Sequence, residues 1–531
     1  MNCDRREKRL TKSWKLRLSL AIFLLLGILL AAPPQGRAQT AAPFDVTGMD
    51  QFVREQIETW KVPGLAIAVV QNGRVVYSRG FGLRDVKRNL PVTPKTLFAI
   101  GSISKSFTAL SMGILNDEGK LDWDTPVRRY LPDFAMYDPV ASERMTPTDL
   151  ITHRVGMAGH DLVWYSSDFS REDLVHRLRF LQSNHDFRSR YQYNNLLVTT
   201  AGYLVGKISG QSWEDFVRQH IFEPLEMKSS NFSVLESQKS ADFSLPYHED
   251  EKTGAVSEIP FHPLSSIGPA GSINSNIEEM ARYAIFQLGD GKAGDRQLIS
   301  KANLTLNHSP QVPMPDPSRP QEIGLRSYAM GWVISSYRGH ALWWHNGGID
   351  GFYALLALLP DDNLGVVILT NLLGDDPVPE IVSYHVYDQL FELSAVDWGK
   401  RFKELEKKQK AADDEEHKEE VAKRKANTRP SHELHDYAGV YEHPGYGTFS
   451  VQFDGKGLKA ALNKLSFSLE HSQYDIFQSP PDSTGSIDIG PVRFLTDMDG
   501  NISSLAAPLD PDAPEILFTR VQEKEPQQKK K

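Results

Sequence analysis

A serine and a lysine three positions apart, Ser102 and Lys105, place a potential nucleophile beside a potential base. The stretch Phe98–Thr108 has the pattern of a strand followed by a helix, and a helix that begins at Ser102 would return Lys105 to the same face one turn later. The positive end of the helix dipole would also favour negative charge at the serine oxygen. Both effects lower the cost of forming an alkoxide, which predicts a covalent nucleophile at Ser102. Short Ser/Lys coincidences are common, so the prediction depends on partners elsewhere in the chain.

Two later stretches carry the residue types that would complete such a site. Tyr193 is followed by two asparagines, the second of which is Asn195, and His345 is followed by Asn346 and Gly347. Alone, a tyrosine beside asparagines is more often part of a turn, and a histidine beside tryptophans is more often a core residue. Free lysine and tyrosine both titrate near pH ~10, so either group needs a special electrostatic setting to act as a base at neutral pH.

Taken in order, the three motifs Ser-x-x-Lys, Tyr-x-Asn and His-x-Gly resemble those of the serine β-lactamase and penicillin-recognising hydrolase superfamily. The similarity is closest to the class C branch, with its related esterases and D-amino-acid peptidases, and it covers about Phe44 to Leu393. The resemblance implies that Ser102 is the acylated nucleophile and that Lys105 is its close proton partner. It further implies that Tyr193 takes the proton from the serine and passes it to the leaving group.

The same resemblance assigns the substrate-binding positions. Asn195 would orient the lysine and a substrate amide, and His345 and Gly347 would lie on the strand that lines the substrate. The backbone N–H groups of Ser102 and Gly348 would form the oxyanion hole, in which each donor contributes roughly 3 kcal/mol in comparable systems.

His345 departs from the lysine that many β-lactamases and cell-wall carboxypeptidases carry at this position. A lysine there is a permanent cation that can hold a substrate carboxylate, whereas histidine is mostly neutral at pH 7. We therefore expect weak carboxylate recognition, which favours hydrolysis of esters or small D-amino-acid amides over efficient hydrolysis of antibiotics.

The composition excludes several other classes of protein. The chain has 531 residues, enough for two or three domains, and its net charge of −9 gives no reason to expect a nucleic-acid partner. The single cysteine, Cys3, excludes an intrachain disulfide and a cysteine-rich metal site. The histidines show no His-Glu-x-x-His or comparable ligand spacing, so we expect neither a metal nor another cofactor.

Residues 1–38 have the pattern of an export signal. A basic segment precedes the apolar run Leu18–Ala32, and Gly36-Arg37-Ala38 offers small residues for signal peptidase. Cleavage near Ala38 would release a periplasmic or secreted protein. An uncleaved membrane anchor is the alternative, because the apolar run is long for a signal core although short for a spanning helix. A membrane is expected as a partner only in that case.

The next part of the chain predicts an α/β domain over residues 44–395. A helical pattern over Met49–Trp60 is followed by a hairpin whose tight-turn dipeptide is Asn72-Gly73, and a long helical insertion separates this hairpin from later strands. The strands are expected at 65–70, 74–80, 330–335, 341–344, 353–359 and 364–370. We expect one antiparallel sheet, as in β-lactamases and transpeptidases, with the terminal helices on one face, the helical insertion on the other and Ser102 at the seam.

The C-terminal part changes character twice. Residues 396–430 are densely charged with both signs, which predicts a solvated helix or a linker. From 431 to 522, short strand patterns with glycine turns predict a small β domain. The stretch Leu434–Tyr441 resembles the start of the lipocalin-like domain that is often appended to these hydrolases, which implies a small all-β barrel but no ligand. The lysine-rich tail 523–531 is expected to be disordered.

The sequence therefore predicts an exported serine hydrolase that acts through a covalent acyl-enzyme on small-molecule or peptide substrates: small esters, amides or D-amino-acid peptides, with cell-wall fragments among the candidates. Two alternatives stay open. The first is a β-lactamase or a β-lactam-acylated penicillin-binding or sensor protein, and the second is a catalytically silent binding scaffold. Turnover kinetics with an ester and a penicillin would separate these classes.

Overall fold

The computed structural model describes residues 45–250, 253–316, 319–373, 376–479 and 489–522. The predicted signal segment 1–38 and the predicted tail 523–531 lie outside these ranges. Within them, no helix combines the length and the hydropathy needed to cross a membrane.

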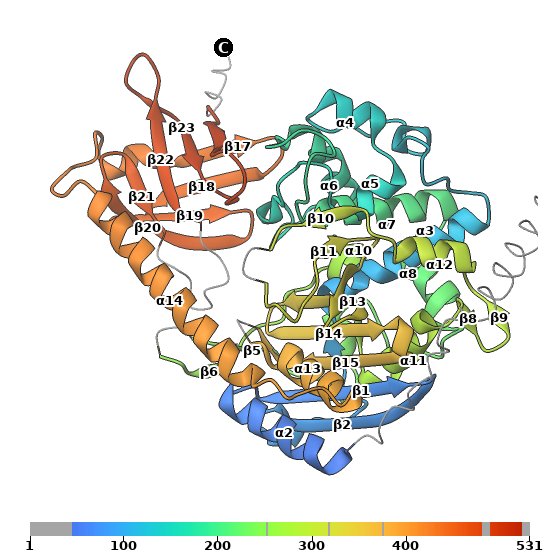
Figure 1. The fold of residues 1–531 in the computed structure, drawn as a ribbon. Coiled ribbons are helices and arrows are strands. Elements are labelled where there is room, and N and C mark those ends of the chain that lie inside the picture. Colours follow the sequence, from blue (N-terminus) through green and yellow to red (C-terminus); the bar gives the residue numbers. More distant parts are fainter. Residues whose placement is uncertain (1–44, 251–252, 317–318, 374–375, 480–488, 523–531) are drawn as a thin grey trace, which may run out of the picture. The chain divides into compact units, whose positions relative to one another are not determined.

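An antiparallel sheet of nine strands forms the centre of the N-terminal domain (Figure 1). The strands are β1 (Gly64–Gln71), β2 (Arg74–Asp85), β3 (Leu90–Pro91), β10 (Val312–Met314), β11 (Arg326–Tyr328), β12 (Val333–Tyr337), β13 (His340–Ile349), β14 (Phe352–Leu359) and β15 (Leu364–Thr370). Their order is β10-β11-β12-β13-β14-β15-β1-β2-β3, so strands from the two ends of the domain meet where β1 pairs with β15. All neighbouring pairs in this order are antiparallel, which confirms the predicted fold class.

The β1–β2 hairpin turns at Asn72 and Gly73, as the sequence predicts. Both residues have positive φ, 52° and 72°, the geometry of a type I′ turn, which asparagine and glycine adopt at low cost. β1 is buried along nearly its whole length, and β2 and β15 pair with its two edges. Most of β2 is exposed or half-buried, so only the first strand of the hairpin belongs to the core.

The predicted strand 330–335 begins later than expected, at Val333. Gly331 has a φ of +76°, which breaks an extended strand, and the N–H of Ala329 donates to the carbonyl of Trp332 across this turn. A methyl group on Gly331 would lie 2.8 Å from the backbone carbonyl of Lys105, so the turn packs directly on the residues that follow Ser102. The sequence of residues 330–335 did not predict this turn, because Gly331 is its only residue of a type that is common in turns.

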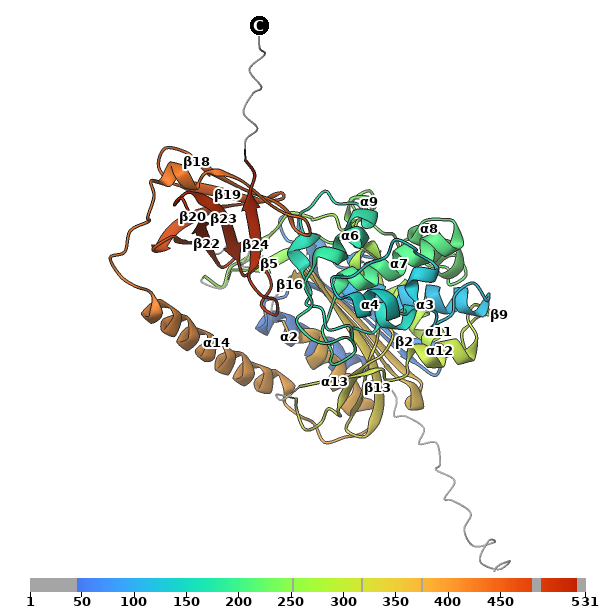
Figure 2. The same ribbon diagram turned by 90° about the horizontal axis from the view of Figure 1, so that it is seen from above.

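Helices cover both faces of the sheet (Figure 2), which confirms the predicted layers. On one face lies α2 (Val46–Thr59), which buries Met49 and Val53. On the other, α11 (Ile277–Leu288) packs so closely that a methyl group on Gly365 of β15 would lie 3.4 Å from Ala284. The helices of the insertion are α3 (Ser104–Asp117), α4 (Pro139–Arg144), α5 (Pro147–Ile151), α6 (Arg171–Arg177), α7 (Asn195–Ser209), α8 (Trp213–Val217), α9 (Val234–Ser237), α10 (Gly268–Gly271) and α12 (Lys301–Asn307). The insertion ends before the later strands, and α13 (Val378–Leu390) follows them.

The densely charged segment forms helix α14 (Trp398–Lys423), whose first turn is capped by the Asp397 side chain. Trp398 is buried, with its ring 4.7 Å from that of Tyr384, and the ammonium group of Lys403 lies 3.6 Å from the centre of the Trp60 ring. The middle of the helix is exposed. Packing of the first turns therefore fixes one end of a helix that its own composition would leave solvated.

A closed barrel of eight antiparallel strands follows α14, which confirms the predicted all-β fold of this region. Its strands are β17 (Gly439–His443), β18 (Gly447–Phe453), β19 (Leu458–Leu462), β20 (Leu465–Gln473), β21 (Ile476–Gln478), β22 (Pro491–Thr496), β23 (Ile502–Ala507) and β24 (Ile516–Arg520). Closure comes from the pairing of β17 with β24, which leaves no free edge. Aromatic rings fill the interior, among them Tyr441, Phe449 and Phe518.

Candidate active site

Ser102 lies in a tight turn of 3-10 helix, Gly101–Ile103, which we call the nucleophile turn, between β4 (Phe98–Ala99) and α3. The predicted helix start at Ser102 is wrong by two residues, because α3 begins at Ser104. Gly347 of β13 packs closely against this turn, since a methyl group on it would lie 1.9 Å from the carbonyl oxygen of Ile100, the residue before the turn. A turn with three residues per repeat still aligns Ser102 with Lys105.

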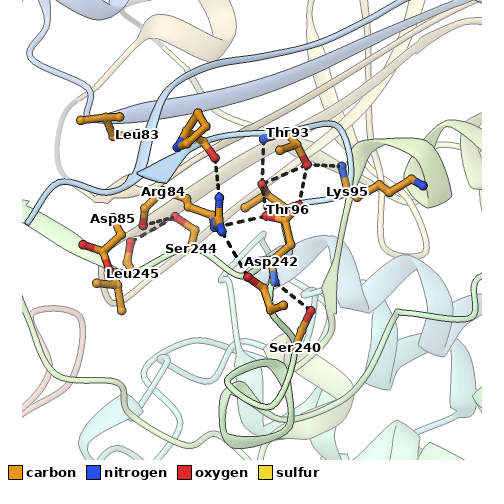
Figure 3. A network of polar contacts seen from close by, with 12 residues as sticks. Leu83, Arg84, Asp85, Thr93, Lys95, Thr96, Ser240, Asp242, Ser244 and Leu245 are labelled. Atoms are coloured by element: carbon orange, nitrogen blue, oxygen red, sulfur yellow. Dashed lines mark hydrogen bonds and ion pairs between the residues drawn. The ribbon is translucent and has the colours of Figure 1, made fainter. Parts of the chain in front are cut away.

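A polar network holds the segment that leads into the nucleophile turn (Figure 3). The carboxylate of Asp242 accepts hydrogen bonds from the hydroxyls of Thr93 and Thr96, each at 2.6 Å, and lies 3.3 Å from the Arg84 guanidinium. The backbone carbonyl of Asp242 accepts a further bond of 3.0 Å from Leu97, the residue before β4. This network ties the end of β2 to the strand that delivers the serine.

The side chain of Lys105 is fully buried and points at the serine. Its Nζ lies 2.8 Å from Ser102 Oγ and donates a second hydrogen bond of 2.8 Å to the carbonyl of Ala270 in α10. Burial lowers the pKa of Lys105 to about 7, and the negative charge of Asp161 opposes this shift. The lysine can therefore exchange a proton near neutral pH.

The ring of Tyr193 packs against Lys105, with its centre 4.7 Å from Nζ. Burial raises the pKa of Tyr193, and a hydrogen bond with Ser102 only partly offsets this rise. The phenol therefore keeps its proton at neutral pH. The two predicted proton-transfer groups thus meet at Ser102 with pKa values shifted in opposite directions.

The residues around Tyr193 fix its position. Asn194 caps helix α7 by accepting a bond of 2.9 Å from Leu197, and its side-chain amide donates to the carbonyl of Ala158 at 2.6 Å. Its backbone N–H donates to Nδ1 of His153, whose ring centre lies 4.3 Å from that of Tyr193. Helix capping and ring packing together hold the tyrosine over the lysine.

Asn195 lies at the start of α7, and its amide donates a hydrogen bond of 3.0 Å to Asp161. Among the described residues it makes no hydrogen bond to Lys105, so its predicted contact with the lysine is replaced by an indirect one through Asp161. His160, the residue before Asp161, forms hydrogen bonds with residues of the C-terminal domain. Its backbone N–H donates to Asp510 at 2.6 Å, and its Nδ1 lies 2.8 Å from the Tyr446 hydroxyl. The sequence offers no spacing signal for Asp161, which begins the short 3-10 helix Asp161–Val163.

Both ring nitrogens of His345 are engaged. Nε2 accepts a hydrogen bond of 2.9 Å from the hydroxyl of Tyr328, a residue that the motif analysis did not single out, and Nδ1 donates to the carbonyl of Asn346 at 2.5 Å. Burial, with a smaller contribution from Lys105, lowers the pKa of His345 to about 3. The imidazole is therefore neutral at physiological pH and has no free nitrogen for a substrate carboxylate.

The glycines of β13 bring two backbone N–H groups together at the nucleophile turn. A methyl group on Gly347 would lie 2.9 Å from the nitrogen of Ser102, and one on Gly101 would lie 3.2 Å from the nitrogen of Gly348. Only glycine permits such an approach, and Gly101 also has a φ of +49°. The nitrogens of Ser102 and Gly348 are thus close to each other, as the predicted oxyanion hole requires.

Among the described residues, no group of three or more His, Cys, Asp or Glu side chains could hold a metal ion.

The N-terminal domain matches the family model described as beta-lactamase over residues 49–389, which is more than half of the chain. The chain belongs to the beta-lactamase family. A second family model, described only as a domain of unknown function (DUF3471), matches residues 423–520, which include the barrel.

This beta-lactamase-family protein is similar in sequence or structure to several known proteins. An unguisins hydrolase of Aspergillus campestris is 28% identical over 434 residues, covering 76% of this chain and 77% of the relative. Protein flp of Staphylococcus aureus strain MW2 is 25% identical, covering 63% of this chain and 65% of the relative. A structure of an octameric penicillin-binding protein homologue from Pyrococcus abyssi is 24% identical, with a TM-score of 0.60, and covers 90% of this chain and 100% of the homologue. The structural similarity shows the fold, and the family and its relatives support hydrolase activity in general.

Proposed function

We propose that this chain is an exported serine hydrolase that acts through a covalent acyl-enzyme on small esters, amides or D-amino-acid peptides. The observation that carries the proposal is the 2.8 Å contact between Ser102 Oγ and the buried Nζ of Lys105, whose pKa is lowered to about 7. A base with a pKa near the working pH is both available in its neutral form and strong enough to take a proton.

In the first step, the neutral amine of Lys105 takes the hydroxyl proton of Ser102 as Oγ attacks the substrate carbonyl carbon. The carbonyl oxygen becomes an oxyanion, and the N–H groups of Ser102 and Gly348 would stabilise it. Collapse of this intermediate breaks the bond to the leaving group, which departs with a proton and leaves an acyl group on the serine. Attack by water on the acyl-enzyme then releases the acid and restores the hydroxyl.

Tyr193 enters this scheme as a donor rather than as the first base. Its raised pKa keeps the phenol protonated, and the hydroxyl lies where it can hydrogen-bond to Ser102. We infer that Tyr193 passes a proton to the leaving group and is then reprotonated from the Lys105 ammonium. In this scheme Lys105 takes the proton from Ser102. The family resemblance instead implies that Tyr193 takes that proton, and both schemes let Tyr193 protonate the leaving group.

The state of His345 guides the choice of substrate. A neutral imidazole with both nitrogens engaged provides no positive charge for the carboxylate of a penicillin or of a peptide terminus. This favours esters and amides without a carboxylate next to the scissile bond. The two Aspergillus relatives are named unguisins hydrolases, which supports hydrolysis rather than a silent scaffold.

A turnover assay separates the proposed hydrolase from a β-lactam-acylated sensor. We expect the wild-type protein to turn over a p-nitrophenyl ester many times per molecule, and the Ser102→Ala variant to lose that turnover while keeping its thermal midpoint. A single stoichiometric release of p-nitrophenol, or stable stoichiometric labelling of the protein by a fluorescent penicillin, with no further turnover would favour the sensor. Equal rates for the wild type and the alanine variant would exclude Ser102 as the nucleophile.

Export is a separate part of the proposal, which rests on the basic and apolar segments of residues 1–38. Expression of the full chain in a bacterial host, followed by fractionation and N-terminal sequencing, tests it. We expect a periplasmic or secreted product that begins just after Ala38. A cytoplasmic product that keeps its first residues would refute export.

A further inference from the structure

The residue before Asp161 has an unusual backbone conformation. His160 is fully buried and has a φ of +50°, in the left-handed region, and the 3-10 helix Asp161–Val163 starts directly after it. A residue with a Cβ keeps such a conformation only where its surroundings hold it. The direction in which the Asp161 side chain leaves the backbone therefore depends on the groups that hold His160.

His160 makes hydrogen bonds through its backbone N–H and both ring nitrogens, and the C-terminal domain supplies two of the partners. The backbone N–H donates to Oδ2 of Asp510 at 2.6 Å. Nε2 lies 3.2 Å from the carbonyl oxygen of Gln182, which can only accept, so Nε2 carries the proton and Nδ1 accepts the bond of 2.8 Å from the Tyr446 hydroxyl. Burial lowers the pKa of His160, although Asp510 and Asp161 oppose the shift, so the ring is neutral at pH 7.

The two barrel segments that contact His160 are themselves held in place. Asp510 lies between β23 and β24, and its Oδ1 accepts a hydrogen bond of 2.9 Å from the backbone two residues later. Tyr446 is fully buried in the turn between β17 and β18, where two carbonyl oxygens accept bonds of 2.7 and 3.1 Å from the guanidinium of Arg177 in α6. These contacts limit how far His160 can move.

Asp161 is the residue through which this arrangement reaches the reaction centre. Its Oδ1 accepts hydrogen bonds of 2.6 Å from Trp164 Nε1 and 3.0 Å from the Asn195 amide, and its negative charge stabilises the ammonium form of Lys105. Other titratable groups also lie near Lys105, and burial keeps them neutral at pH 7: Tyr193, His153 and His345. The position of the Asp161 carboxylate therefore affects the proton affinity of the lysine.

The packing around Gly159 shows how close the barrel comes to the catalytic tyrosine. A methyl group on Gly159 would lie 3.5 Å from Oδ2 of Asp161 and 3.6 Å from Oδ2 of Asp510. The same methyl group would lie 3.6 Å from the carbonyl oxygen of Tyr193. The barrel carboxylate, the Asp161 carboxylate and the backbone of Tyr193 therefore all adjoin one residue.

We propose that Asp510 and Tyr446 of the C-terminal domain are positioning residues of the active site, which act through His160 to hold the Asp161 carboxylate near Lys105. The inference rests on the proposed function and adds the barrel to the structure that supports the reaction. Without the bonds from the barrel, the backbone of His160 would relax from its left-handed conformation. Asp161 would then turn away, and the ammonium form of Lys105 would lose the charge that stabilises it.

The pH profile of ester hydrolysis tests this role. Tyr446→Phe, which removes a hydroxyl and no charge, and Asp510→Ala should each move the rise of kcat/KM for p-nitrophenyl acetate to lower pH by about 0.3 to 1 unit, because the lysine loses its proton more easily. The matched controls, Tyr474→Phe and Asp512→Ala, change exposed side chains of the same domain and should keep the wild-type profile.

A double variant separates positioning from a direct effect of the Asp510 charge. In Asp161→Asn the charge that Asp510 helps to place is already absent, so adding Asp510→Ala should produce little further shift. A second shift of full size would show that Asp510 acts on Lys105 through its own charge, and the inference would be wrong.

Profiles of Tyr446→Phe and Asp510→Ala that coincide with the wild-type profile would also overturn the inference. So would a lower rate at every pH without a shift, which marks a purely structural role. If circular dichroism shows that Asp510→Ala does not fold, Tyr446→Phe decides, because it keeps the buried ring. Turnover that is lost in Ser102→Ala upholds the proposed hydrolase whichever result the barrel variants give. If the wild type turns over no ester, the proposed hydrolase fails, and NMR titration of the ¹³Cε signal of Lys105 measures the same shifts.

Discussion

Lys105 and Tyr193 are buried against each other, with the lysine Nζ 4.7 Å from the centre of the tyrosine ring, and burial shifts their pKa values in opposite directions. Desolvation penalises the charged form of each group, which is the protonated lysine and the deprotonated tyrosine. The same burial therefore makes the lysine a base and keeps the tyrosine an acid. This division of roles underlies the predictions that follow.

The pH dependence of acylation should follow the ionisation of Lys105. Because its pKa is lowered to about 7, the neutral amine predominates above that pH and the inactive ammonium below it. We expect kcat/KM for an activated ester to rise about tenfold per pH unit well below pH 7 and to level off above it. A pH–rate profile with p-nitrophenyl acetate measures this, and a rise centred near pH 10 would mean that burial does not tune the lysine.

Removing the charge of Asp161 should move that profile. The carboxylate stabilises the ammonium form of Lys105, so Asp161→Asn should lower the lysine pKa further and shift the rise to lower pH, by up to about 1 unit. Asp361→Asn, an exposed carboxylate, serves as the control that leaves the profile in place. An upward shift in Asp161→Asn would have the wrong sign for this electrostatic role.

Tyr193→Phe keeps the ring that packs on His153 and removes the hydroxyl. We expect acylation to slow by about 100-fold, the usual effect of losing a positioned acid or base. Stopped-flow measurement of the acylation phase, with circular dichroism to confirm the fold, tests this. A rate near that of the wild type would leave proton delivery to Lys105 alone.

His345→Lys should shift the substrate preference toward molecules that carry a carboxylate. The new cation could contribute about 1 kcal/mol where water reaches it and more in a dry site, so the ratio of kcat/KM for a penicillin to that for an ester should rise several-fold. Tyr328→Phe removes the hydrogen bond to His345 without adding charge and should leave that ratio nearly unchanged. An unchanged ratio in the lysine variant, or a wild type that already prefers penicillin, would count against this role of the third motif.

Parts of this structure follow from the sequence because local chemistry determines them. Asn72-Gly73 specifies its hairpin through the backbone conformation that both residues tolerate, and the apolar run of β15 identifies a buried strand that pairs with β1. The nucleophile turn does not follow in the same way. It packs against Gly347, which is far away in the chain, and no local pattern separates its 3-10 geometry from the α-helix that follows.

The site itself was predicted only where it carries motifs. Ser102, Lys105 and Tyr193 are brought together as their motifs suggest, but the groups that tune them carry no spacing signal. Asp161 begins the short 3-10 helix Asp161–Val163, and the carbonyl of Ala270 belongs to the backbone and has no side-chain pattern at all. Such partners are defined by tertiary packing, which a single sequence does not display.

Identification of the acylated residue tests the central claim most directly. The protein is mixed with p-nitrophenyl acetate, quenched with acid during turnover and digested, and the peptides are analysed by mass spectrometry. We predict an acetyl group on Ser102 in the wild type, slower appearance of that group in Tyr193→Phe, and none in Ser102→Ala. An acetyl group on another residue that forms and disappears at the turnover rate, with Ser102 unmodified, would contradict the account.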